Sequence, residues 1–172
     1  MPLISRSLRI AVPFAASALL LLTACAPSVS IEEAPDANNP ACAPMMLALP
    51  DSLADAKRRT TTAQATAAWG EPAVVVLRCG VQVPGPTTDR CVTVNGVDWV
   101  MKEGADSWTL TTYGRNPATE MILGKNKVPS DTVMTQISVA ASKIPATGGC
   151  IGLGDVPTAK PSPAPEPAPT KG

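Results

Sequence analysis

Histidine is absent from the 172-residue chain, and aromatic residues make up only 3% of it. Without imidazole the chain cannot build a Ser-His-Asp or Cys-His catalytic site, a histidine-ligated zinc site or an imidazole pH switch. Charge of one sign is not in excess either, because 14 basic residues balance 14 acidic ones. A neutral chain with few aromatic side chains does not have the composition of a nucleic-acid-binding protein, so we expect no nucleic-acid partner.

Familiar catalytic and cofactor-binding motifs are also missing. The sequence contains no S-x-x-K, K-T-G, G-x-S-x-G, P-loop, G-x-G-x-x-G or EF-hand pattern, so we expect no cofactor and no metal ion. Glu103 and Asp106 form a close acidic pair, and two carboxylates can hydrolyse a glycoside or hold Ca²⁺. They flank Gly104 in a predicted turn, which favours a solvated loop instead.

The N-terminal segment resembles a bacterial lipoprotein signal. Arg6 and Arg9 precede an apolar run over Ile10–Leu22, which is shorter than the roughly 20 residues that a membrane-spanning helix needs. The run ends in Leu22-Thr23-Ala24-Cys25, which resembles the lipobox of prolipoproteins. We therefore predict a signal peptide over residues 1–24 and lipidation of Cys25. The alternative is an ordinary secretory signal with a chance cysteine.

Lipidation of Cys25 would determine where the protein is located. Two acyl chains, such as palmitate, bury enough methylene groups to anchor a protein stably without a polybasic patch. We therefore expect a cell-envelope protein that is lipid-anchored on the extracytoplasmic side of the cell membrane. Ala26 follows the cysteine, which leaves open which membrane holds the protein in an envelope with two membranes.

Three further segments follow the signal. Residues 25–41 contain three prolines and few large apolar side chains, which is typical of a flexible tether. Residues 42–150 have the composition of one globular domain. Residues 151–172 form a disordered tail with six prolines, which is either a spacer that crosses wall polymer or a ligand for an SH3-like domain.

Four cysteines remain once Cys25 carries lipid: Cys42, Cys79, Cys91 and Cys150. An even number in an exported chain indicates structural disulfides. None of them is spaced as C-x-x-C, so neither a thioredoxin-like redox pair nor a four-thiolate zinc site is indicated. Three connectivities are possible, and the residues alone do not choose between them.

The globular segment is predicted to be α+β: a small, mostly antiparallel sheet with two or three short helices, held by disulfides. Helices are expected over Cys42–Leu49 and Asp131–Ile144, with Ser130 or Asp131 capping the second, and a short helical turn within Ala63–Ala68. Four or five strands are expected. Besides the two strands of a hairpin, they are Ala73–Arg78, Ser107–Tyr113 and Ala118–Leu123, and the first of these reads as buried on both faces.

A β-hairpin is the strongest local prediction. Asn95-Gly96 accepts the positive φ angles of a type I′ turn and separates two β-prone runs, Cys91–Val94 and Val97–Val100. The turn would pair Val94 with Val97 and Val92 with Trp99.

Asp98, Trp99, Tyr113 and Arg115 form the best candidate binding cluster. Aromatic rings beside a guanidinium suit a sugar or a carboxylated wall peptide. Two alternatives stay open: a tryptophan in so aromatic-poor a domain can be a core anchor, and an Asp98–Arg115 pair can simply lock the hairpin. Lys57-Arg58-Arg59 reads as a solvated loop that can touch anionic headgroups.

Five sequence blocks occur in a recognisable order after Cys42: Leu49-Pro50, Ala68-Trp69-Gly70-Glu71-Pro72, Leu77-Arg78-Cys79-Gly80-Val81, Val97-Asp98-Trp99, and Thr111-Thr112-Tyr113-Gly114-Arg115. They resemble the actinobacterial lipoprotein family catalogued as domain of unknown function 3515, over roughly residues 42–150. The resemblance implies an exported, membrane-anchored protein without an assigned activity. It also favours a Cys42–Cys79 disulfide, which leaves Cys91 to pair with Cys150. The main rival connectivity is Cys79–Cys91 with Cys42–Cys150.

The function expected from these observations is that of a non-catalytic binding or structural module at the outer face of the cytoplasmic membrane. Its possible partners are an envelope protein or a wall component, in addition to the membrane that holds the lipid anchor. The alternative is a small envelope enzyme that acts on a wall component through carboxylates such as Asp98, Glu103 or Asp106.

Overall fold

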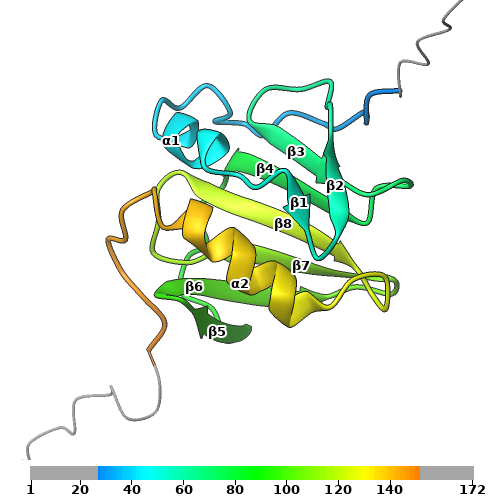
Figure 1. The fold of residues 1–172 in the computed structure, drawn as a ribbon. Coiled ribbons are helices and arrows are strands. Elements are labelled where there is room, and N and C mark those ends of the chain that lie inside the picture. Colours follow the sequence, from blue (N-terminus) through cyan, green and yellow to red (C-terminus); the bar gives the residue numbers. More distant parts are fainter. Residues whose placement is uncertain (1–26, 152–172) are drawn as a thin grey trace, which may run out of the picture.

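The computed structural model describes residues 27–151. The predicted signal peptide, Cys25 and residues 152–172 lie outside the described residues. The described chain forms one eight-stranded antiparallel sheet in the order β1-β2-β3-β4-β8-β7-β6-β5, with both helices on the same face (Figure 1). The elements are α1 (Cys42–Leu47), β1 (Ser52–Leu53), β2 (Ala56–Arg59), β3 (Thr66–Trp69), β4 (Val75–Val81), β5 (Arg90–Val94), β6 (Val97–Glu103), β7 (Ser107–Thr112), β8 (Ala118–Gly124) and α2 (Ser130–Ala141). No helix in this part of the chain is long and apolar enough to cross a membrane.

The β5–β6 hairpin at one edge of the sheet forms as predicted. Val94 pairs with Val97, and Val92 pairs with Trp99. Asn95 and Gly96 both have positive φ, 49° and 73°, as a two-residue type I′ turn requires. The register of β5 and β6 therefore follows from a local signal.

The α+β class holds in its coarse form, but the sheet is larger than expected. The polar segment before residue 62 contains β1 and β2, which are joined through Ala54 and Asp55 at positive φ, 44° and 68°. Ala63–Ala68 is not helical, since Thr66–Trp69 forms the buried strand β3 between β2 and β4. Pairing on both edges outweighs the helical preference of alanine.

The sheet has one covered and one open face. Val75, Leu77 and Cys79 of β4 are fully buried, whereas Val76 and Arg78 between them are partly exposed. The prediction that this strand is buried on both faces is therefore wrong, because the helices cover only one side of an antiparallel sheet.

The core lies between the covered face and the two helices. Trp69 and Trp99 are both fully buried there. Each indole has a hydrogen-bond acceptor: Trp69 Nε1 donates to the Pro50 carbonyl at 3.0 Å, and Trp99 Nε1 donates to Ser138 Oγ at 3.2 Å. α2 begins after Pro129 without a side-chain cap, so the predicted capping by Ser130 or Asp131 is wrong.

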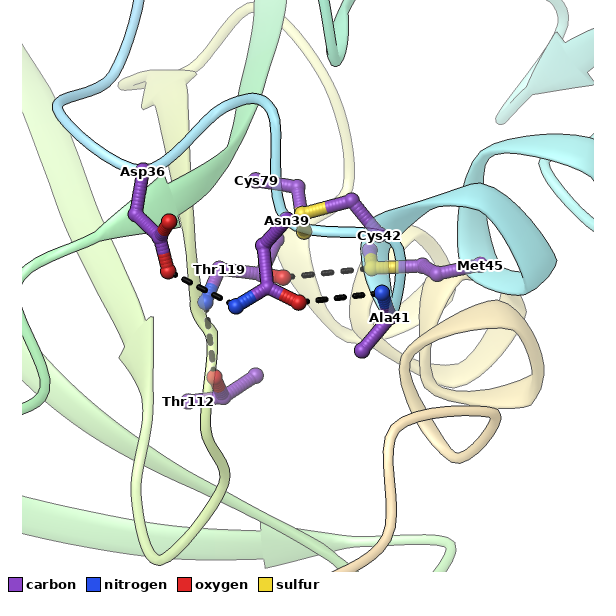
Figure 2. The surroundings of a disulfide bond; sticks show 8 residues. All are labelled: Asp36, Asn39, Ala41, Cys42, Met45, Cys79, Thr112 and Thr119. Carbon is purple, nitrogen blue, oxygen red and sulfur yellow. Dashed lines mark hydrogen bonds between the residues drawn. A yellow bond between two sulfur atoms is a disulfide. The ribbon is translucent and has the colours of Figure 1, made fainter.

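Both disulfides join the pairs that were expected. Cys42–Cys79 links α1 to β4 with a Cα–Cα distance of 5.9 Å, and Cys91–Cys150 links β5 to the chain after α2 with 6.3 Å. Figure 2 shows the first bond beside Met45, whose sulfur accepts a hydrogen bond from Thr119 Oγ1 at 3.1 Å. The first disulfide thus connects a helix to the sheet, and the second connects the irregular chain after α2 to the edge strand β5.

Residues 27–41 are part of the domain, which corrects the prediction of a flexible tether there. Val29 N donates to the Thr60 carbonyl at 2.9 Å, and Asp36 N donates to the Gly80 carbonyl at 2.9 Å. Ala34 is buried nearby. Gly80 has a φ of 95°, and a Cβ at this position would overlap the Asp36 carbonyl, so only glycine permits the contact. Backbone hydrogen bonds, rather than large apolar side chains, hold this segment.

Candidate functional site

Trp99 lies in the core and not on the surface predicted for it. Side chains alternate along β6, so Trp99 shares the covered face with Val97 while Asp98 lies on the opposite face. Trp99 has no exposed area. A ligand therefore cannot stack on this ring without opening the core.

Arg115 is also buried, with 5% of its surface exposed. Its guanidinium donates hydrogen bonds to the Ile144 carbonyl and, at 2.9 Å, to the Gly96 carbonyl. It therefore ties the end of the α2 segment to the β5–β6 turn. Burial lowers the pKa of Arg115, and the negative charge of Asp98 partly opposes this shift. The Arg115 Nε has no hydrogen-bond partner among the described residues.

Asp98 and Tyr113 are the two members of the predicted cluster that lie on the open face. The Asp98 carboxylate accepts from Thr93 Oγ1 at 2.5 Å and from the Cys150 backbone N at 2.7 Å. Tyr113 is half-buried, and its backbone N donates to the Asp98 carbonyl at 2.8 Å. The four predicted residues are therefore neighbours on β6 and the segment that follows β7, but they do not share one accessible surface.

A polar groove runs over the open face of the sheet, and we refer to it as the open-face groove. It consists of two adjoining hollows with volumes of about 480 and 650 Å³, which share Pro86, Thr87, Asp89 and Val100. The loop of residues 82–89 between β4 and β5 forms one wall of both hollows. Tyr113 lines the second hollow.

Two compensated charge pairs line the first hollow. Arg78 Nη2 lies 2.6 Å from Glu120 Oε1, and the Arg78 Nε donates to the same oxygen at 3.0 Å. Lys102 Nζ lies 3.6 Å from Asp89 Oδ2. The hydroxyls of Thr109 and Thr111 line the floor beside them, and each hydroxyl can both donate and accept. The groove therefore offers paired charges and hydroxyls rather than a net charge.

Sequence reasoning did not assemble this groove. Glu120 is 42 residues away from Arg78, so only the β4–β8 register brings the two together. The alternation of Thr109 and Thr111 with Trp108 and Leu110 was a usable signal for a polar outer face on β7.

The other predicted polar positions serve local structure. Glu103 pairs with Lys125 at 2.6 Å at the β6–β7 turn, and Lys125 lies 5.1 Å from the Trp108 ring centroid. Arg59 belongs to β2 and pairs with Glu71 at 2.6 Å, which corrects the solvated-loop prediction for residues 57–59. Within residues 27–151, no cluster of three or more cysteine or acidic side chains is placed to hold a metal ion.

Comparison with known proteins gives one match. A family model described as "Protein of unknown function (DUF3515)" matches residues 7–148, which is most of the chain. No curated protein and no solved structure matches.

Proposed function

The chain belongs to the DUF3515 family, and from this premise we propose that it is an exported, lipid-anchored envelope protein that binds a partner without catalysing a reaction. The lipobox-like Leu22–Cys25 supports the anchor, which would hold the protein on the outer face of the cytoplasmic membrane, as expected for an actinobacterial lipoprotein. The two disulfides support export, since disulfides persist mainly in oxidising compartments.

The open-face groove is the observation that carries the binding function. An uncovered sheet face is ordinary in an antiparallel protein, but a groove walled by a proline-containing loop is not required by the fold. Its paired charges and threonine hydroxyls suit a neutral, hydrogen-bonding ligand, such as the glycan or peptide part of a wall polymer. Asp98 and Glu103 are engaged in structural contacts, so the proposed role does not use them as catalytic acids.

Site-specific photocrosslinking in the native envelope tests this proposal. A benzophenone amino acid at Thr111 lies in the groove, and the same group at Val139, which is 61% exposed on α2, provides the matched control on the helical side. We expect a discrete adduct from position 111 that is absent from position 139 and is lost after Arg78→Ala. Identical adducts from both positions, or none from position 111, would contradict a binding role for the groove.

A further inference from the structure

The domain is fastened to its N-terminal segment almost immediately after the predicted lipidation site. The Pro27 carbonyl accepts a hydrogen bond from Arg59 Nη2 at 2.5 Å. Two residues later, Val29 exchanges two backbone hydrogen bonds with the chain after β2, at 2.9 and 3.1 Å. Arg59 is itself held by Glu71 at 2.6 Å. We call Pro27–Val29, Arg59 and Glu71 the anchor edge.

Covalent geometry then limits how far the domain can be from the membrane. Only two peptide units separate the Cα atoms of Cys25 and Pro27, so these atoms are at most about 7 Å apart in any conformation. A lipid on Cys25 would therefore bring the anchor edge to the headgroup layer. We infer that the domain contacts the bilayer through the anchor edge and that its sheet holds the second hollow of the open-face groove away from the lipid. This inference rests on the proposed lipid anchor.

The strand order gives the distance between the anchor edge and the opposite edge of the sheet. Six neighbouring steps separate β2 from β5, and at about 4.8 Å per step the two strands lie at most about 29 Å apart in the twisted sheet. The second hollow of the groove is lined by Cys91 and Thr93 of β5, so it lies at the far edge. In Figure 1 the blue N-terminal segment lies beside β2 and β3, and the orange C-terminal segment passes β6 and β5. The second hollow would therefore face the cell wall, and the first hollow, lined by Arg78 of β4 and Glu120 of β8, would lie between it and the anchor edge.

Neither face of the sheet has a surface that would pull the domain flat onto a bilayer. Four cations of the described chain are in ion pairs: Arg59, Arg78, Lys102 and Lys125. Other exposed cations are spread over separate segments, namely Lys57, Arg90, Lys127 and Lys143. The large exposed apolar side chains are single residues on different elements rather than one patch: Leu47, Val83, Val139 and Ile151. The covalent anchor is thus the dominant constraint on orientation.

Fluorescence quenching tests the orientation. Full-length lipidated protein would be reconstituted into phosphatidylcholine vesicles that contain a lipid with a nitroxide on its headgroup. Ser28→Trp places a probe at the anchor edge, and Thr88→Trp places a matched probe at the groove, both at exposed positions. After subtraction of the parent emission, we expect the Ser28→Trp signal to be quenched several-fold more strongly than the Thr88→Trp signal. A flexible Gly-Ser insertion of about twelve residues between Ala26 and Pro27, which spans roughly 20 Å, should remove the difference.

Each other outcome overturns the inference in a recognisable way. Equal, strong quenching at both positions would show that the sheet lies flat on the bilayer. Weak quenching at both positions, in protein that floats with the vesicles, would show that the domain is held off the membrane although the lipid anchor of the proposed function is intact. Protein with a mature N-terminus that does not float would refute the anchor itself, and the orientation with it.

Discussion

Replacing Arg115 by methionine separates a structural role for this residue from the ligand-binding role that its sequence context indicated. Methionine keeps most of the apolar stem but leaves the carbonyls of Ile144 and Gly96 without their donor. Each hydrogen bond from a charged donor contributes about 1.5–3 kcal/mol to the free energy of unfolding. Removing the buried guanidinium also removes the desolvation penalty of its unpartnered Nε, which offsets about 1–3 kcal/mol of that loss. We therefore expect a net loss of about 3 kcal/mol in the free energy of unfolding.

Equilibrium urea unfolding, followed by tryptophan fluorescence, measures this loss. For a domain of this size, 3 kcal/mol corresponds to a fall of roughly 12 °C in Tm. Arg90→Met is the matched control, because Arg90 is exposed on β5 and its replacement should change the stability by less than about 0.5 kcal/mol. If Arg115→Met is as stable as the Arg90→Met control, the reasoning from the two carbonyl contacts is refuted.

Two further predictions concern backbone packing and the disulfides. A Cβ at Gly114, whose φ is 67°, would overlap the Gly148 carbonyl, so Gly114→Ala should lower Tm strongly. A Cβ at Gly85 meets open space, so Gly85→Ala should leave Tm unchanged, and equal melting curves for the two variants would contradict the packing. Replacing Cys42 and Cys79 together by alanine opens a loop with a sequence separation of 37, which should cost about 4 kcal/mol in denaturant unfolding, and an unchanged midpoint would argue against a stabilising bond.

Local signals explain which parts of the fold were predictable. Asn95-Gly96 determines both a turn and a register, so the β5–β6 hairpin could be read directly from the sequence. β3 could not, because its alanines favour a helix in isolation and become a strand only between β2 and β4. The attachment of residues 27–41 was hidden for a similar reason, since it depends on main-chain hydrogen bonds to residues distant in sequence.

The candidate site was less predictable than the fold. The residues Asp98, Trp99, Tyr113 and Arg115 were correctly seen as neighbours, but sequence proximity does not say which side chains are accessible. Period-two alternation with Val97 would have assigned Trp99 to the core. For Arg115 no such pattern existed, because its acceptors are backbone carbonyls supplied by two distant loops.

The mass of the N-terminal peptide, taken from the membrane fraction of cells that express the full chain, tests the central claim most directly. A lipid-anchored envelope protein predicts a peptide that begins at Cys25 and carries a diacylglyceryl modification. An unmodified Cys25 in mature protein, or an uncleaved N-terminus, would contradict the anchor and the orientation derived from it.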